Sequence, residues 1–414
     1  MNELIDLVSK YEDVSTEKIK KGLADGSIIF VKNIKRDIKP LALGRPLSVK
    51  INANIGTSHY SSDIREELKK LEICERYGAD AVMDLSTGGD LKKIRKEILS
   101  HTKLPVGTVP IYEIACDLVM KKGVGIEKMD INAFLDVVSE QAEEGVDFMT
   151  IHAGLTRECI NRLKNKKRIL GVVSRGGSLL VEWMEKNNKE NPLYKHFDKI
   201  LDIAKKYNVA MSLGDGLRPG STIDATDGPQ IQELIILGEL VTACREKGVP
   251  VMVEGPGHVP INQVETNIKL QKSLCHNAPF YVLGPLVTDM GAGYDHITAA
   301  IGGAWAAYFG ADFLCYVTPA EHLTLPTSKD VKEGIIALKL AAHAADLARN
   351  NGKAWKKEME MSRARRELNW EKQISCSFNP EKAEKMLRGK IKKSYPCTMC
   401  GDLCAIKTSD RCKI

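Results

Sequence analysis

Short runs of β-branched and aromatic residues alternate with longer amphipathic stretches from about residue 48 onward. Runs of this kind are typical of buried strands, and the stretches between them have the apolar spacing of helices. Regular alternation of strands and helices predicts an α/β fold with a parallel sheet. The candidate strands are Val49–Asn52, Ala79–Met83, Val106–Ile111, Phe148–His152, Gly171–Ser174, Ala210–Leu213, Val251–Glu254, Phe280–Leu283 and Phe313–Val317.

Polar or glycine-rich turns follow many of these strands. They occur at residues 54–56, 84–88, 152–154, 174–177, 214–216 and 254–258. A (β/α)8 barrel builds its site from the carboxyl ends of many strands, whereas a doubly wound sheet concentrates ligand residues at one switch point. The spread of the turns therefore favours a (β/α)8 TIM-type barrel, although the candidate strands number one more than a barrel needs.

The chain is long enough for one large barrel with small appendages, because it has 414 residues, of which 43% are hydrophobic and 28% charged. We predict four segments. These are a short helical N-terminal extension over 1–45, a substrate-binding barrel over 46–327, a helical segment over 328–375 and a cysteine-bearing arm over 376–414.

Charge and cysteine usage narrow the function. The net charge of +6 is the small difference between 60 basic and 54 acidic residues, which argues against nucleic acid and suits an anionic small molecule. Residues 1–6 carry acidic side chains where a secretion signal has basic ones, and no run of 18 apolar residues occurs. We therefore expect a soluble cytoplasmic protein that does not bind membranes. Eight of the eleven cysteines are scattered, so three clustered ones indicate a metal in a reducing compartment.

The three clustered cysteines are Cys397, Cys400 and Cys404, spaced as C-x2-C-x3-C. Iron–sulfur clusters are usually held by four cysteines, so a triad leaves one iron open to a substrate or to S-adenosylmethionine. The alternative is a structural zinc site with Cys412 as the fourth ligand. Spacing alone leaves both interpretations open.

Two loops place an arginine beside glycines, where a guanidinium and backbone N–H groups can hold a phosphate. Arg175 lies in Ser174-Arg175-Gly176-Gly177, and Arg218 lies in Asp215-Gly216-Leu217-Arg218-Pro219-Gly220. Each loop taken alone is equally compatible with an ordinary turn that carries a surface arginine. Together they suggest a phosphorylated substrate.

Histidines also occupy strand ends. His258 and His322 lie in turns at the end of different strands, and two such histidines suit zinc or another divalent ion. His152 ends one candidate strand and Tyr281 lies in another, so both are placed to reach the barrel mouth. A single histidine is more often a core or surface residue.

Motifs along the chain from residue 48 to the triad together resemble a known family. They are Asn54-Ile55-Gly56-Thr57-Ser58, residues 82–88, Gly107-Thr108-Val109-Pro110-Ile111-Tyr112, Ile151-His152-Ala153-Gly154, residues 173–178, residues 213–220, Glu254-Gly255-Pro256-Gly257-His258, Gly293-Tyr294-Asp295-His296 and residues 316–323. The set resembles the phosphomethylpyrimidine synthases (ThiC) of thiamine biosynthesis, which are radical S-adenosylmethionine enzymes.

The resemblance implies a (β/α)8 barrel in a homodimer, with the arm of each subunit reaching the partner's barrel. It implies that Cys397, Cys400 and Cys404 hold a [4Fe–4S] cluster whose open iron chelates S-adenosylmethionine, and that His258 and His322 bind zinc or another divalent metal. It assigns substrate contacts to Asn54, Met83, Tyr112, His152, Ser174, Arg175, Gly176, Asp215, Gly216, Leu217, Arg218, Glu254 and Tyr281.

The implied reaction uses an unidentified electron donor to cleave S-adenosylmethionine to a 5′-deoxyadenosyl radical. The radical abstracts hydrogen from 5-aminoimidazole ribotide, a small phosphorylated imidazole, and starts its rearrangement to 4-amino-5-hydroxymethyl-2-methylpyrimidine phosphate. The cofactor performs the radical step, and the barrel positions and shields it.

The sequence departs from the family pattern at two places. Many members have four residues between the second and third cysteines, whereas this chain has three. Residues 288–293 read Thr-Asp-Met-Gly-Ala-Gly, where Asp-Ile-Ala-Pro-Gly is expected before Tyr294. Two alternatives therefore stay open. One is 5-hydroxybenzimidazole synthase, which uses the same ribotide to make the cobalamin lower ligand, and the other is a non-catalytic, zinc-stabilised ligand-binding barrel.

Overall fold

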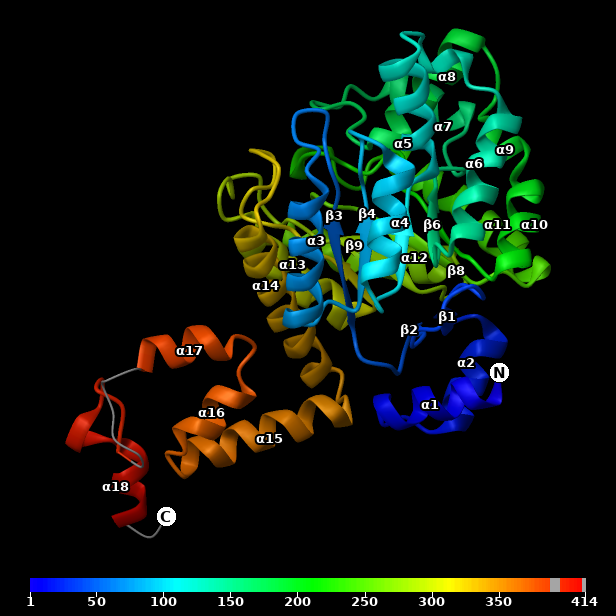
Figure 1. Cartoon of the computed structure of the whole chain (residues 1–414). Coiled ribbons are helices and arrows are strands. Elements are labelled where there is room, and N and C mark those ends of the chain that lie inside the picture. The colour runs from blue at the N-terminus through cyan, green and yellow to red at the C-terminus, as the bar shows by residue number, and fades with distance from the viewer. Residues whose placement is uncertain (388–394, 412–414) are drawn as a thin grey trace. The chain divides into compact units, whose positions relative to one another are not determined.

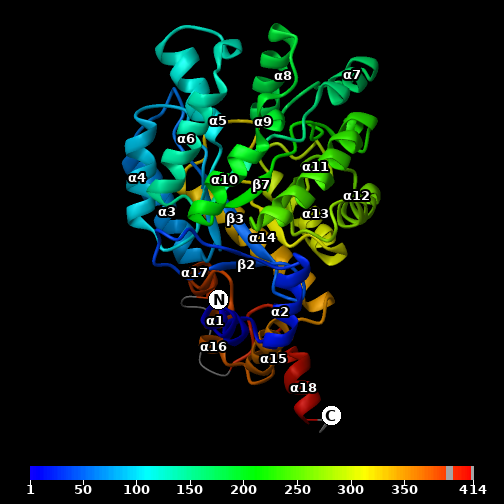
Figure 2. The same ribbon diagram turned by 90° about the vertical axis from the view of Figure 1, so that its right-hand side faces the viewer.

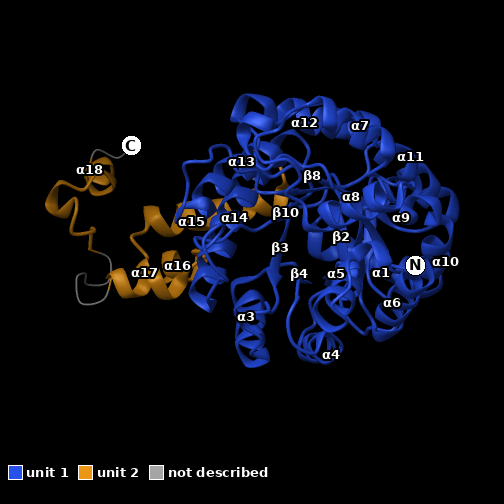
Figure 3. Ribbon diagram, turned by 90° about the horizontal axis from the view of Figure 1, so that it is seen from above, with its two compact units in different colours: residues 1–346 blue, residues 347–414 orange. Residues whose placement is uncertain are grey.

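The computed structural model of the protein describes residues 1–387 and 395–411 (Figure 1). Two compact units divide the chain, residues 1–346 and residues 347–414, shown in two colours in Figure 3. In the described residues, no helix combines the length and the apolar character that crossing a membrane requires.

The first unit is built around a closed barrel of eight parallel strands, which confirms the predicted fold class. The order around the barrel follows the chain, and β10 closes it by pairing with β3. The strands are β3 (Lys50–Ile55), β4 (Ala81–Asp84), β5 (Val106–Thr108), β6 (Phe148–Ile151), β7 (Ala210–Leu213), β8 (Val251–Gly255), β9 (Phe280–Leu283) and β10 (Phe313–Cys315).

Helices surround the strands when the unit is seen from above (Figure 3). The longer ones are α3 (Ile64–Tyr77), α4 (Leu91–His101), α6 (Ile131–Glu144), α10 (Phe197–Tyr207), α11 (Gly228–Lys247), α12 (Ile261–Leu274), α13 (Asp295–Phe309) and α14 (Ser328–Ala348). The unit also contains α5 (Pro110–Ala115), α7 (Arg157–Asn165), α8 (Arg175–Asn187) and α9 (Pro192–Lys195).

Local signals explain where several of these helices begin and end. The side chains of Asp63, Asp90 and Asp130 accept hydrogen bonds from first-turn N–H groups of α3, α4 and α6. Gly78 and Gly145 end α3 and α6 in the left-handed conformation that glycine adopts without a steric penalty. The strands between the helices are buried on both faces, as expected in a parallel barrel.

The candidate strand Gly171–Ser174 is wrong, because this segment is a loop that leads into α8. β6 pairs directly with β7, which leaves no place between them for another strand. The backbone N–H groups of Ile169 and Leu170, just before the segment, donate to Asp224 at 2.9 and 3.0 Å. Ser174 then caps α8 by accepting from Gly177 N. Side chains of Asp224 and Ser174 thus accept the backbone hydrogen bonds and keep this segment a loop, although its composition is typical of a strand.

The N-terminal extension contains a hairpin as well as the predicted helices. It consists of α1 (Asn2–Glu12), α2 (Thr16–Asp25) and the antiparallel strands β1 (Ile29–Val31) and β2 (Leu41–Leu43). Alternate hairpin residues belong to different cores. Phe30 and Ala42 pack with α1 and α2, whereas Ile29 and Val31 join the core of the barrel.

The extension lies at the end of the barrel where the strands begin (Figures 1 and 2). Asn33 N donates to Asp147 Oδ1 at 2.9 Å, immediately before β6. Asn208, just before β7, donates from Nδ2 to the carbonyl oxygen of Lys32 at 2.8 Å. The extension therefore covers the barrel bottom, opposite the strand ends at which TIM-barrel sites form.

The described part of the second unit contains the helices α15 (Gly352–Arg366), α16 (Trp370–Cys376), α17 (Pro380–Leu387) and α18 (Ala405–Arg411). Asn351 caps α15 by accepting from Ala354 N. Trp370 Nε1 donates to the carbonyl oxygen of Tyr395 at 2.9 Å and connects α16 to the cysteine segment. The predicted segment boundaries at 45, 327 and 375 stay predictions.

Candidate active site

A cavity of about 260 Å³ lies at the carboxyl ends of the barrel strands. Its walls bring together residues from the whole length of the barrel sequence. The predicted contact residues among them are Asn54, Met83, Tyr112, His152, Arg175, Asp215, Arg218, Glu254 and Tyr281. Ser174, Gly176, Gly216 and Leu217 are not part of the lining and belong to the two arginine-bearing loops.

Two carboxyl groups, of Asp215 and Glu254, and the Arg218 guanidinium belong to this lining. Arg218 Nη1 donates to Asp215 Oδ1 at 3.2 Å, in the loop after β7. Glu254 Oε1, on β8, accepts from the hydroxyls of Thr150 and Ser212 at 2.6 and 2.8 Å. Burial raises the pKa of both carboxyls, and for Asp215 the Glu254 charge raises it further against the opposing effect of Arg218. Carboxyls of this kind can hold a proton where exposed ones cannot.

His152 is a neutral imidazole at this site. Burial and the nearby charge of Arg218 lower its pKa to about 3. Its Nε2 lies 3.2 Å from Ser174 Oγ, which also accepts from Gly177 N at the start of α8. A Cβ atom on Gly176 would lie 2.3 Å from the imidazole. Glycine at this position therefore allows α8 to approach His152 closely.

Arg175 is the first residue of α8, and its guanidinium lies 4.9 Å from the ring centroid of Tyr112. The cation–π contact with the Tyr112 ring orients the Arg175 guanidinium. The N-terminus of the helix adds the positive end of its dipole and free backbone N–H groups. This corner of the cavity is therefore suited to an anion.

The second arginine loop is held from behind by Glu233, in α11. Its two carboxylate oxygens accept from Gly216 N and Leu217 N at 2.8 and 2.7 Å. Burial raises the pKa of Glu233 to about 7 although these hydrogen bonds oppose the shift. The Glu233 carboxylate thus holds the backbone of this loop in place. Sequence reasoning missed Glu233, since nothing distinguishes it from other helical glutamates.

A polar cluster from β3, β9 and β10 completes the barrel interior. Asn52 Nδ2 donates to the Tyr281 hydroxyl at 2.8 Å, and Asn54 Nδ2 to Cys315 Sγ at 3.1 Å. Burial raises the pKa of the Cys315 thiol to about 11, which keeps it protonated. Cys315 and Glu321 line the cavity but were missed from the sequence. The strand-end rule would have found Cys315, because it is the last residue of β10.

His258 and His322, separated by 64 positions in the chain, face each other at the mouth of the barrel. Their Nε2 atoms are 3.3 Å apart. Two zinc ligands with Zn–N bonds of about 2.0–2.1 Å in a tetrahedral site are separated by about 3.3–3.4 Å. The spacing therefore fits two imidazole nitrogens that converge on one divalent ion.

A carboxylate contacts the Nδ1 atom of each imidazole. His258 Nδ1 lies 2.8 Å from Asp289 Oδ1, and His322 Nδ1 lies 3.3 Å from Asp295 Oδ2. Carboxylates in this position orient metal-binding histidines and fix the tautomer that leaves Nε2 free. His322 also has a positive φ of 62°, which is uncommon for a residue with a side chain. Asp289 belongs to the segment that departs from the family pattern, whose Met290 is 92% exposed.

The cysteine triad lies in the second unit, in a tight turn. Gly401 N and Cys400 N donate to the carbonyl oxygen of Cys397, and a 3-10 turn over Gly401–Leu403 leads to Cys404. Hydrogen bonds from the backbone N–H groups of Cys400 and then Met399 lower the pKa of Cys397. Thiolates that accept such bonds suit a cluster.

In the part of the chain that the structure describes, no three His, Cys, Asp or Glu side chains are gathered as a metal site. Cys412, the fourth ligand of the zinc alternative, lies outside the described residues.

The barrel mouth and the cysteine turn define a class: a (β/α)8 barrel enzyme that acts on a small substrate and carries a cysteine triad on a separate unit. The model of the radical SAM ThiC family matches residues 1–411, and the chain belongs to this family. Membership implies a [4Fe–4S] cluster and S-adenosylmethionine.

Similar proteins match over almost their whole length. The phosphomethylpyrimidine synthase of Methanocaldococcus jannaschii is 56% identical over 98% of this chain and 95% of its own. That of Carboxydothermus hydrogenoformans is 57% identical, with coverage of 97% and 94%. That of Thermodesulfovibrio yellowstonii is 53% identical, with coverage of 99% and 97%.

Proposed function

We propose that the protein converts 5-aminoimidazole ribotide to 4-amino-5-hydroxymethyl-2-methylpyrimidine phosphate for thiamine biosynthesis, in the cytoplasm. One observation carries the proposal. Nine of the thirteen residues that the resemblance assigns to the substrate, spread along the sequence from Asn54 to Tyr281, line one cavity. The names of the similar proteins support the same activity.

The lining suggests how the ribotide is held. Its phosphate is placed at Arg175 and the start of α8, where a guanidinium and the helix dipole favour an anion. Asp215 and Glu254 accept hydrogen bonds from the ribose hydroxyls and the amino group. His152, neutral at physiological pH, is placed to hydrogen-bond without adding charge. Met83 and the apolar walls limit the access of water, which protects a reactive intermediate.

Cys397, Cys400 and Cys404 hold the [4Fe–4S] cluster in this proposal, and His258 with His322 holds zinc or another divalent ion. With S-adenosylmethionine and an electron from an external donor, the cluster supplies the hydrogen-abstracting radical chemistry. The backbone N–H groups at Cys397 support a thiolate there. The carboxylates Asp289 and Asp295 support the two imidazoles.

The proposed assembly is a homodimer in which the cysteine arm of one subunit serves the barrel of the other. An exposed apolar stripe on α13 supports a subunit interface: Ile297, Ile301, Trp305 and Tyr308 are each between 42% and 50% exposed. Their spacing of three and four residues places them on one face of the helix. Large exposed apolar faces of this kind mark interaction sites.

Product analysis tests the function. The anaerobically reconstituted and reduced protein is incubated with S-adenosylmethionine and 5-aminoimidazole ribotide, and the products are identified by mass spectrometry. We expect the pyrimidine phosphate together with 5′-deoxyadenosine. Formation of 5-hydroxybenzimidazole would instead assign the chain to the related synthase, and a protein that takes up zinc but no iron or sulfide would support the non-catalytic barrel.

The cluster assignment has a separate test. Cys400→Ala is expected to lose bound iron, acid-labile sulfide and 5′-deoxyadenosine formation, while its circular dichroism stays that of the wild type, because the triad lies outside the barrel unit. Cys376→Ala, in α16 of the same unit, is the matched control and should keep the cluster. A Cys400→Ala protein with full iron content contradicts the assignment.

A further inference from the structure

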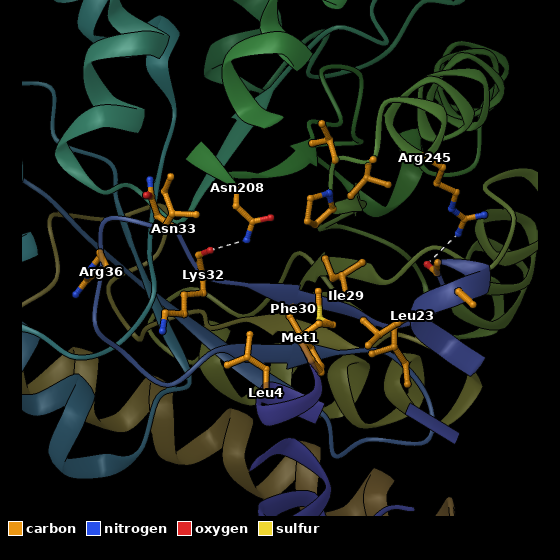
Figure 4. A pocket seen from close by; sticks show the side chains of 18 residues that line it. Met1, Leu4, Leu23, Ile29, Phe30, Lys32, Asn33, Arg36, Asn208 and Arg245 are labelled. Atoms are coloured by element: carbon orange, nitrogen blue, oxygen red, sulfur yellow. Dashed lines mark hydrogen bonds between the residues drawn. The ribbon is translucent and has the colours of Figure 1, made fainter. Parts of the chain in front are cut away.

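A second and larger cavity, of about 600 Å³, lies between the N-terminal extension and the bottom of the barrel (Figure 4). One wall comes from α1, α2 and β1 of the extension. The other comes from the residues that lead into β7 and β8, among them Asn208 and Val251. These strands carry Asp215 and Glu254 near their opposite ends, so the cavity is remote from the candidate active site. Its volume is in the usual range of ligand pockets.

Most of the wall is apolar. Leu4 and Leu23 come from the two helices, Ile29 and Phe30 from β1, and Val249 and Val251 from the barrel. Because the cavity is open to solvent, its apolar walls stay in contact with water until a ligand covers them. The walls therefore suit the hydrocarbon or aromatic part of a ligand.

The charged residues of the lining are all basic: Lys32, Arg36 and Arg245, with no aspartate or glutamate among them. Arg36 is neutralised by Asp147 at 2.8 Å. Among the described residues, Lys32 has no ion-pair or hydrogen-bond partner for its ammonium group. Figure 4 shows Lys32 and Arg36 on one side of the cavity and Arg245 on the other.

The surroundings of Arg245 give the stronger indication of an anion site. Its Nη2 donates to the carbonyl oxygens of Gly26 and His276 at 2.9 and 3.0 Å, but its buried Nε has no hydrogen-bond partner. Within the described ranges, no carboxylate forms an ion pair with it. Burial lowers the pKa of Arg245 and the charge of Asp25 opposes this shift, but the Asp25 carboxylate accepts its hydrogen bonds from Ser27. A partly buried guanidinium without a carboxylate partner favours an anion beside it.

We propose that this cavity binds an amphipathic anion, with its carboxylate, sulfonate or phosphate at Arg245 and its aliphatic or aromatic body along the apolar wall. The ligand is distinct from the substrate of the barrel mouth, because the two cavities lie at opposite ends of the strands. The assignment of this site does not depend on the proposed function.

Ligands of equal chain length and different charge test the proposal. Decanoate, 1-decanol and decyltrimethylammonium are titrated below their aggregation concentrations into the reconstituted full-length protein by isothermal titration calorimetry. We expect decanoate to bind at one site per chain, at least about tenfold more tightly than the alcohol, since a charge-assisted hydrogen bond adds to the apolar burial. The cation should not bind. Equal binding of decanoate and the alcohol overturns the anionic assignment, and failure of decanoate to bind overturns the site.

Variants locate the binding. Arg245→Gln should weaken decanoate binding about tenfold or more, and Ala24→Trp, at an exposed position of α2 on the cavity wall, should abolish it by filling the space. Lys20→Gln, on the same helix but outside the lining, is the control for a lost positive charge. Decanoate binding that survives in Ala24→Trp shows that the anion binds elsewhere and refutes the proposal. Circular dichroism verifies that each variant is folded.

Discussion

Glu233 fixes the loop that carries Asp215 and Arg218, although it does not line the cavity. Replacement by glutamine puts an amide NH2 group against one of the two loop N–H groups and leaves it unpaired, which costs about 1–3 kcal/mol. We predict that Glu233→Gln raises KM for the ribotide about tenfold and changes kcat less. Steady-state kinetics checks this split.

Glu239→Gln is the matched control, because Glu239 is an exposed glutamate of the same helix. It should leave both kinetic constants unchanged. If Glu233→Gln lowers only the fraction of folded enzyme, kcat falls at constant KM and the positioning role is wrong.

The same glutamate predicts a pH dependence of stability. Burial raises the pKa of Glu233 from 4.5 to about 7, so between these values the folded chain binds a proton that the unfolded chain has released. The free energy of unfolding must then fall as pH rises through this window, by up to about 3 kcal/mol. The difference in unfolding free energy between wild type and Glu233→Gln should shrink by this amount from pH 4.5 to 7. A constant difference in urea titrations contradicts it.

The imidazole pair makes a prediction about metal content. His258→Ala should reduce zinc, measured by mass spectrometry after dialysis of the reconstituted protein, from about one ion per chain to nearly none. Asp289→Asn should weaken zinc binding by about 10–100-fold, since it orients His258. His101→Ala, at an exposed position of α4, should retain the metal. Zinc that remains in His258→Ala rules out this ligand pair.

At the scale of elements, α8 and the loop after β7 touch through two glycines. A Cβ atom on Gly177 would lie 2.3 Å from the carbonyl oxygen of Gly216, and backbone cannot move aside as a side chain can. We predict that Gly177→Ala lowers the free energy of unfolding by about 1–3 kcal/mol. Gly228→Ala is the control, because its Cβ would meet nothing within 4 Å, and it should be neutral or stabilising. Equal urea midpoints for the two variants contradict the close approach.

The strands were predictable because each is a short apolar run buried on both faces, and this pattern survives in the sequence. Gly171–Ser174 has the same composition but forms a loop, since the decisive contacts come from Asp224 and from the cap of α8. The amino-acid composition of a segment indicates whether it is buried. It does not indicate that a side chain more than 50 positions away, such as Asp224, accepts hydrogen bonds from its backbone. The hairpin of the extension was missed for another reason: its short strands precede the alternation of strands and helices that begins near residue 48, so no repeated pattern marks them.

Candidate site residues were predictable where they sit at strand ends, because the barrel topology brings all strand ends together. The convergence of His258 and His322 could be proposed but not deduced, since it depends on how two loops close over 64 positions. Glu233 could not be predicted at all. It acts through backbone N–H groups, which every residue except proline has.

At the scale of the whole molecule, the proposed dimer predicts rescue between two inactive variants. The Cys400→Ala subunit keeps an intact barrel, and the Glu254→Gln subunit keeps an intact cysteine arm. If each arm serves the partner's barrel, mixed dimers regain one working site in two, or about one quarter of wild-type activity for equal amounts after subunit exchange. No recovery of pyrimidine formation on mixing indicates that each arm serves its own barrel.

The apolar stripe of α13 offers a second measurement of the same assembly. Trp305→Glu places a charge in the middle of the stripe and should convert dimer to monomer in light scattering after size exclusion. Tyr60→Glu, at a position that is 95% exposed in the loop between β3 and α3, should stay dimeric. If the Trp305→Glu protein remains dimeric, the subunit interface does not lie at α13.

The cover that residues 1–47 form over the barrel bottom has a consequence for synthesis of the chain. These residues leave the ribosome before the barrel does. Asn33 binds Asp147, however, and the residues before β8 arrive only at positions 248–250. At about 5–20 residues per second, Ile29 and Val31 wait roughly ten to forty seconds for the barrel surface that buries them. During that interval the hairpin presents one apolar face to solvent, and we expect a chaperone that shields nascent chains to bind this face.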